Sequence, residues 1–165
     1  MIGFVNPGLF QIGDAVSSDQ PVEFDRIPRF APEYFATLRA KQSTRQKQFQ
    51  KGLEQLEEEG AMQVFVVHEG LRSEPILAVV GELQFDVLQS RLETEYGVET
   101  TLTTLPYKLA RWVDRDVDDV ARMTLPSRSR LATDHNGRAV VLFTSDWELE
   151  YAQKENPDVE FKSAS

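Results

Sequence analysis

One stretch near the middle of the chain constrains the fold most, because its hydrophobic pattern changes at a single glycine. Residues 76–80 form an unbroken apolar run of strand length, which is typical of a strand covered on both faces. After Gly81, apolar residues recur at spacings of three and four, the stripe of an amphipathic helix: Phe85, Leu88, Leu92 and Tyr96. Gly97 then stands where a helix C-cap glycine belongs. The stretch predicts a buried strand that passes directly into a helix.

The composition describes a folded, acidic chain without cysteine. Of its 165 residues, 41% are hydrophobic, enough for the core of one domain of ordinary size. The lack of cysteine excludes disulfides and thiolate metal sites and suits a reducing, cytoplasmic setting. No apolar run approaches the length of a membrane span, and the N-terminus lacks a secretory signal pattern, so we expect no membrane contact. A net charge of −9 excludes nucleic-acid binding by bulk charge, so any RNA contact would have to be local.

The neighbouring segments supply partners for the central strand and helix. Period-two patterns predict strands at 27–39 and 61–68, with a helix at 42–60 between them. A long strand over 98–113 follows the central helix, and Pro106 interrupts it, as suits a sheet edge or a bulge. The resulting order of strand, helix, strand, strand, helix, strand is the split βαβ, or ferredoxin-like, plan. We therefore predict an α+β fold with a ferredoxin-like core over residues 27–113.

Beyond this core the pattern predicts a β-hairpin and a helix as an extension over residues 114–165. The expected elements are a short helix at 115–123, strands at 128–133 and 138–143, and a helix at 145–155. Asn136-Gly137 indicates a tight hairpin turn, because both residues tolerate positive φ. Ser145 and Glu148 have the spacing of a helix capping box, as do Ser43 and Gln46.

Residues 1–26 predict two short strands joined by turns. Two short strands do not form a stable sheet alone. They are either a hairpin packed on the domain that follows or the end of a β-barrel that lies mostly upstream.

Few groups in the chain have catalytic character. The sequence holds no phosphate loop, no dinucleotide-binding glycine motif, no zinc-protease helix and no serine-hydrolase elbow. His68 and His135 each stand alone, at a strand end and in a turn. The acidic run 114–119 lacks the central glycine and final glutamate of a calcium loop, which favours helix capping instead. We predict no catalytic residue, metal ligand or cofactor site in these residues.

Basic residues supply the candidate binding site. One group lies at the end of the first strand and the start of its helix: Arg39, Lys41, Arg45, Lys47 and Lys51. A second group spans the predicted hairpin: Arg128, Arg130 and Arg138. Such groups on an acidic protein either follow phosphates locally or serve as ordinary solubilising charge.

Several separated blocks resemble one known family. Residues 81–87, Gly-Glu-Leu-Gln-Phe-Asp-Val, are similar to a signature in the third domain of elongation factor G, itself a ferredoxin-like domain. More specific blocks resemble the class II bacterial release factors, the peptide chain release factor 3 family of translational GTPases. These blocks are residues 6–14, 27–33, 47–56, 58–61, 95–99, 131–134, 147–149 and 156–158. The resemblance covers nearly the whole chain.

The resemblance implies a domain plan and a function. In that family a GTPase domain and a β-barrel domain precede the C-terminal domain, so residues 1–26 would be the last barrel strands and 27–165 the C-terminal domain. The GTPase domain, with its GTP and Mg²⁺, has no counterpart here, so the resemblance implies a non-catalytic, ribosome-binding part of a cytoplasmic termination factor. The intact factor removes class I release factors from the ribosome, and its C-terminal domain helps dock it through rRNA and ribosomal proteins. The group from Arg39 to Lys51 is the predicted contact.

Two other interpretations stay open. A third-domain fragment of elongation factor G or of a ribosomal protection protein would share the ferredoxin-like core, although the elements after Asp114 disfavour it. A free-standing ferredoxin-like hydrolase of the acylphosphatase type would need an arginine and backbone amides that form a phosphate cradle.

Overall fold

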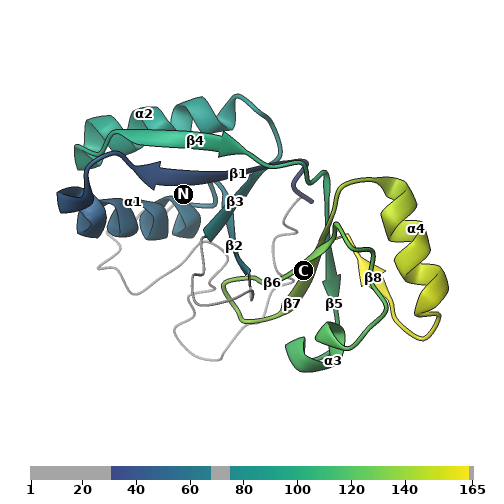
Figure 1. The fold of residues 1–165 in the computed structure, drawn as a ribbon. Coiled ribbons are helices and arrows are strands. Elements are labelled where there is room, and N and C mark those ends of the chain that lie inside the picture. Colours follow the sequence, from purple (N-terminus) through teal and green to yellow (C-terminus); the bar gives the residue numbers. More distant parts are fainter. Residues whose placement is uncertain (1–30, 68–74, 164–165) are drawn as a thin grey trace, which may run out of the picture.

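The strands of the described residues, 31–67 and 75–163 of a computed structural model, form one antiparallel sheet in the order β4-β1-β3-β2-β6-β7-β5-β8 (Figure 1). Its first half contains β1 (Tyr34–Ala40), the 3₁₀ turn η1 (Ser43–Arg45), α1 (Gln46–Glu58), β2 (Gln63–Val67), β3 (Pro75–Val79), α2 (Gln84–Tyr96) and β4 (Thr100–Thr104). Its second half contains β5 (Leu109–Val113), α3 (Val117–Ala121), β6 (Arg130–Thr133), β7 (Ala139–Phe143), α4 (Asp146–Glu155) and β8 (Phe161–Lys162). The predicted α+β class is confirmed.

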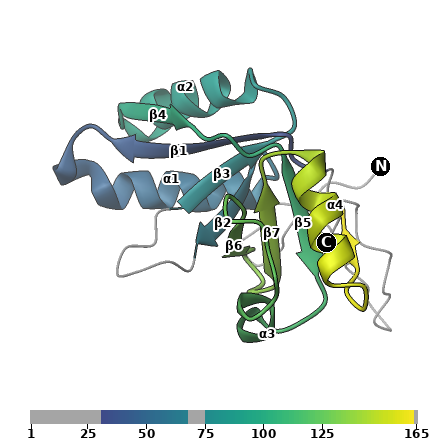
Figure 2. The same cartoon turned by 45° about the vertical axis from the view of Figure 1, so that its right-hand side comes forward.

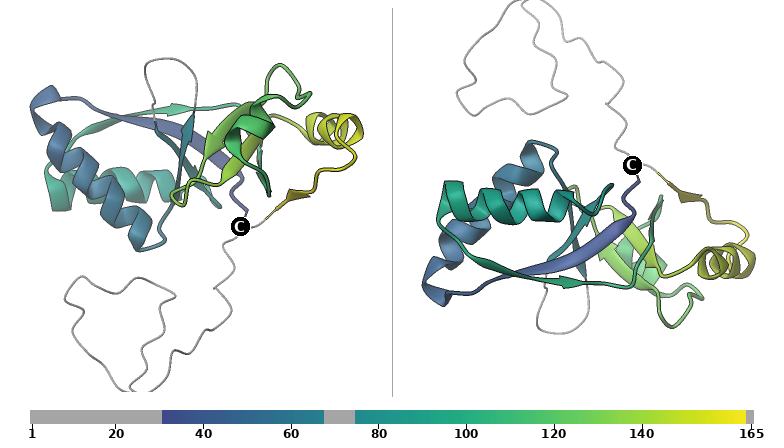
Figure 3. Two further views of the ribbon diagram at one scale, coloured as in Figure 1. Left: turned by 90° about the horizontal axis from the view of Figure 1, so that it is seen from below. Right: turned by 90° about the horizontal axis from the view of Figure 1, so that it is seen from above.

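Helices α1 and α2 cover one face of β1–β4 (Figures 1 and 3). Strand β3 lies inside this half and is buried on both faces, as the apolar run predicts, but it ends at Val79, and Val80 is 45% exposed. Leu77 and Val79 pack with the two helices, whereas Ile76 and Ala78 belong to a separate core on the opposite face. This division follows from the alternation of side chains along a strand.

The predicted helical stripe of α2 is confirmed. Phe85, Leu88 and Leu92 are buried in one cluster with Phe49, Leu53 and Leu56 of α1, and Tyr96 packs against it partly buried. Gly97 has φ +65° and ends α2, and its N–H donates to the carbonyl of Glu93. The left-handed conformation explains why glycine stands at this position.

The strand predicted over 98–113 is interrupted at Pro106 as predicted, but its two parts are separate strands with different partners. Strand β4 pairs with β1 and lies at the edge of the sheet, while β5 pairs with β7 and β8. Between them, the N–H of Leu105 still donates to Phe35 and the N–H of Lys108 already donates to Phe143. Pro106 has no N–H for either ladder. Strand β8 has no signal in the sequence analysis.

A shared core joins the two halves of the sheet. The ring of Phe65 on β2 lies 6.4 Å from that of Phe35 on β1 and 5.9 Å from that of Trp112 on β5, measured between centroids. On β7, Val140 and Leu142 face this core. Val141 and Phe143 belong to a third cluster with residues from α3, α4 and β8. Figure 2 shows α3 and α4 beside β7 and β5.

Three of the predicted local motifs are wrong in detail. In the acidic run 114–119, Asp116 stands at the N-cap position of α3, but its side chain makes no capping hydrogen bond. Ser43 does not cap α1, because residues 43–45 form a 3₁₀ turn and no side chain caps either segment. The β6–β7 connection is not a two-residue turn: it spans residues 134–138, and only Gly137 in it has positive φ. By contrast, the Ser145 hydroxyl accepts a hydrogen bond from the Glu148 N–H and caps α4 as predicted.

Some predictions lie outside the described residues, namely the strands expected over 1–26, the start of the 27–39 strand, and His68 with the connection after it. Where the chain is described, its helices are too short or too polar to cross a membrane.

Candidate functional site

The first predicted basic group runs from the end of β1 into the first half of α1 (Figure 1). All five of its side chains are exposed: Arg39, Lys41, Arg45, Lys47 and Lys51. Lys47 and Lys51 lie one turn apart on α1, on the side away from its buried stripe. We call Lys41, Arg45, Lys47 and Lys51 the basic end of α1.

Arg39 does not join the basic end of α1. Ala36 and Leu38 of β1 pack toward α1, so Phe35 and Arg39 project from the other face of the strand. Lys41 follows β1 directly and precedes the 3₁₀ turn; its ammonium lies 3.6 Å from the Glu99 carboxylate, and both side chains are more than half exposed. Such a pair contributes little to stability and leaves Lys41 accessible.

The charges of α1 are arranged against its dipole. The first turn has no acidic residue and the last turn has no basic one, whereas Lys47 lies near the start and Glu58 at the end. Each such exposed charge costs about 0.3–1 kcal/mol at low ionic strength. The basic end of α1 is therefore not explained by helix stability.

The second predicted group is not brought together. Arg130 lies opposite Leu142 at one end of the β6–β7 pair, and Arg138 follows the turn at the other end. Arg128 is exposed in the segment before β6. Arg130 donates to the carbonyls of Ser127 and Ser129 at 3.4 and 3.1 Å.

Arg138 is part of a buried polar network centred on Asp134. The Asp134 carboxylate is 8% exposed and accepts the Trp112 indole N–H at 3.0 Å and two guanidinium N–H groups of Arg138 at 3.0 and 2.8 Å. It also accepts the backbone N–H groups of Asn136 and Arg138. Burial acts to raise the pKa of Asp134, but the hydrogen bonds from Arg138 and Trp112 outweigh it, and the pKa is lowered. The network holds the hairpin loop against β5, so Arg138 has a structural partner.

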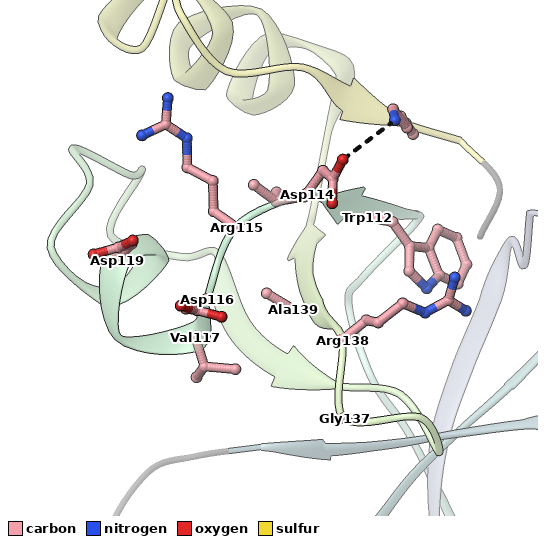
Figure 4. Close-up of a pocket in the computed structure, with 11 residues that line it drawn as sticks. Trp112, Asp114, Arg115, Asp116, Val117, Asp119, Gly137, Arg138 and Ala139 are labelled. Carbon is pink, nitrogen blue, oxygen red and sulfur yellow. Dashed lines mark ion pairs between the residues drawn. The ribbon is translucent and has the colours of Figure 1, made fainter.

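A charged depression of about 660 Å³ lies beside this network, between β5, α3 and the β6–β7 turn. Figure 4 shows both acidic and basic side chains around it, with Asp114 paired to Lys162 at 4.0 Å. Its lining contains no histidine, serine or threonine. Among the described residues, no group of acidic and histidine side chains is placed to hold a metal ion.

A concave surface at the start of α4 was missed by the sequence analysis. Trp147 is 66% exposed there and stacks on Tyr151, with centroids 5.7 Å apart and ring planes at 27°. The signal lies in the spacing: two aromatic rings one helical turn apart, on a helix whose buried side chains are Glu148 and Ala152. Such rings are not needed for the core.

Comparison with known proteins then decides the family. The model of the class II release factor RF3 C-terminal domain matches residues 24–153. The chain belongs to the peptide chain release factor 3 family. A release factor 3 of Symbiobacterium thermophilum is 44% identical over 165 residues, which are all of this chain and 31% of that protein.

Other members of the release factor 3 family give the same picture. The proteins of Gloeobacter violaceus and Trichormus variabilis are 44% and 42% identical over 162 and 163 residues. Those matches cover 98% and 99% of this chain and 30% of each relative. The chain thus spans about a third of the length of these release factors, and the matched model is that of their C-terminal domain.

Proposed function

We propose that this chain contacts the ribosome as the C-terminal domain of a class II release factor in translation termination. Membership of the release factor 3 family supports the process. The basic end of α1 supports the contact, because it is exposed and placed against the helix dipole on an acidic protein. The proposal therefore depends mainly on the exposed basic residues at the start of α1.

The domain plan is part of the same proposal. Residues 27–113 would form a ferredoxin-like core, residues 114–165 its extension, and residues 1–26 the end of an upstream β-barrel. The sheet order β4-β1-β3-β2, with α1 and α2 on one face, supports the ferredoxin-like assignment. GTP and Mg²⁺ would bind an upstream GTPase domain in the intact cytoplasmic factor, and this chain would have no catalytic step.

The contact with the ribosome would be electrostatic and local to the basic residues. Ammonium and guanidinium groups at the basic end of α1 would approach rRNA phosphates, or acidic groups of ribosomal proteins, and release bound counterions. Arg39, Arg128 and Arg130 would add to this from other faces. Arg138 should contribute least, because Asp134 already engages its guanidinium. Class I release factors would be affected indirectly, through the docking of the whole factor.

Ribosome co-sedimentation with the 165-residue chain tests the proposal. Replacing Arg45, Lys47 and Lys51 by Glu should weaken binding by about tenfold or more and flatten its salt dependence, because phosphate contacts carry the salt term.

A matched control makes the same change of net charge elsewhere. Lys108, Arg122 and Lys154 are exposed in the second half of the chain, and their replacement by Glu should leave ribosome binding within about twofold of the original. Equal losses in both triple variants, or none in either, would contradict a contact at the basic end of α1.

A further inference from the structure

We propose that the concave surface at the start of α4 binds an unpaired RNA nucleotide, with the base stacked on Trp147 and the phosphate beside Arg128. The idea rests on the proposed function only for the choice of RNA as the ligand. The site itself is separate from the basic end of α1, since it is built from α4 and from the segments around Pro106 and Arg128.

The aromatic pair is exposed but held in place. Trp147 is 66% exposed, whereas the chain's other tryptophan, Trp112, is 4% exposed and hydrogen-bonded to Asp134. Tyr151 covers part of the Trp147 ring through the stack at 5.7 Å. A base added to this pair would extend an existing stack without ordering a mobile side chain.

The backbone under the pair is fixed by reciprocal hydrogen bonds. The Glu148 side chain is 5% exposed and accepts the Thr144 N–H at 2.7 Å, while the Ser145 hydroxyl accepts the Glu148 N–H at 3.4 Å. These bonds define the first turn of α4, which carries Trp147. The ring is therefore presented from a rigid element.

The hollow beside the rings has the size and chemistry of a nucleotide site. Its volume is about 740 Å³, within the usual range of small-ligand sites. Pro106, Leu125 and Pro126 give it apolar walls, and hydroxyl groups of Ser127 and Thr144 line it as well. Apolar walls suit the base faces, and hydroxyls suit its polar edge.

The accessible charge in the hollow is positive. Arg128 lines it, is exposed, and makes no hydrogen bond or ion pair with another described residue. The lining carboxylate, Glu148, is buried and already bonded to Thr144. Asp146 and Glu150 are exposed on the same helix but do not line the hollow. Arg128 can therefore complement a phosphate close to the stacking rings.

RNA fits these features better than a peptide does. Aromatic surfaces with prolines nearby also receive proline-rich segments. Such a segment would use the rings but leave the Arg128 charge without a partner. A nucleotide uses both the rings and the cation, and single-stranded RNA is recognised by this combination.

Tryptophan fluorescence of the 165-residue chain, titrated with uridylate and adenylate hexamers at low salt, tests the inference. We expect both hexamers to quench Trp147 while buried Trp112 gives a constant background. Trp147→Ala, followed by fluorescence anisotropy of a labelled hexamer, should weaken binding about tenfold, whereas Trp147→Phe should retain most of it. Arg128→Gln should reduce the slope of log Kd against log salt by about 0.7.

Lys154→Gln is the matched control, since this exposed cation lies near the other end of α4, outside the hollow; it should change neither affinity nor slope. No hexamer binding, or equal binding by Trp147→Ala, would overturn the inference. Binding of a proline-rich decapeptide in place of the hexamers would do so too. The assay contains no ribosome, so its failure is distinct from a failure of the sedimentation test at the basic end of α1.

Discussion

The two halves of the sheet are stabilised in different ways. In the first half, α1 and α2 bury an apolar cluster against β1–β4, and the polar contacts between the helices lie at the surface. In the second half, a buried carboxylate, Asp134, fixes the hairpin loop to Trp112 on β5. The first kind of packing follows a periodic pattern that can be read from sequence, whereas the second depends on one residue finding several donors in space.

The shared core should nevertheless make the halves unfold together. Phe65 contacts rings from both, Phe35 on one side and Trp112 on the other. Loss of either half would expose these rings to water, which is unfavourable at about 25 cal/mol per Å² of apolar surface. A single cooperative transition is expected.

The largest effect is expected in the apolar half. Leu92→Ala removes a fully buried side chain from the α1–α2 cluster and should destabilise the protein by about 3–4 kcal/mol. Urea denaturation followed by Trp112 fluorescence, in a Trp147→Phe background, measures this from the opposite half. The control, Val87→Ala on the exposed side of the same helix, should stay within about 0.5 kcal/mol. An unchanged Trp112 transition in Leu92→Ala would show that the halves unfold independently.

The next largest effect is expected at the polar network of the second half. Asp134→Ala leaves the buried indole N–H and two backbone N–H groups without their acceptor, and should cost about 2–3 kcal/mol. Arg138→Gln should cost less, because the arginine side chain is partly exposed and the backbone bonds remain. If the arginine variant were the more damaging one, the network would depend on the ion pair more than on the carboxylate's position.

The stability that Asp134 contributes should depend on pH, and the direction of this dependence follows from its pKa. The pKa of Asp134 is lowered from its ordinary value of 3.8 because the hydrogen bonds outweigh burial. The carboxylate therefore contributes stability that is fully present above 3.8 and is lost as the pH falls through the lower, folded value. Urea midpoints of the original protein and Asp134→Ala should differ most at neutral pH and converge in acid. A constant difference across this range would contradict the assigned shift.

The sequence predicted the helix-covered half well because its signals are periodic. The run 76–80 and the stripes of α1 and α2 depend on neighbours a few residues away. By contrast, β4 ends because the chain after Pro106 pairs with β7 instead of β1. No pattern among neighbouring residues specifies this change of partner. Likewise, β8 has only two paired residues, too few to leave a period.

Charge was harder to interpret than hydrophobicity. Arg138 and Lys51 look equivalent in the sequence, yet one guanidinium is bound to a buried carboxylate and the other cation is exposed. No binding role was predicted for Trp147, whose ring is 66% exposed although an aromatic residue on a helix normally suggests core. In both cases the decisive information is which residues from distant segments lie nearby.

The smallest effect is expected at the surface pairs between the helices of the first half. Arg91 donates to Glu59 at 2.7 Å and to Glu95 at 2.8 Å, linking α2 to the end of α1, and these hydrogen bonds raise the pKa of Arg91. All three side chains are partly exposed, so Arg91→Ala should cost less than about 1 kcal/mol, and less still in high salt. Denaturation at low and high salt measures both values. A loss comparable to that of Leu92→Ala, and insensitive to salt, would mean that the first half also depends on a polar link, and the contrast between the halves would disappear.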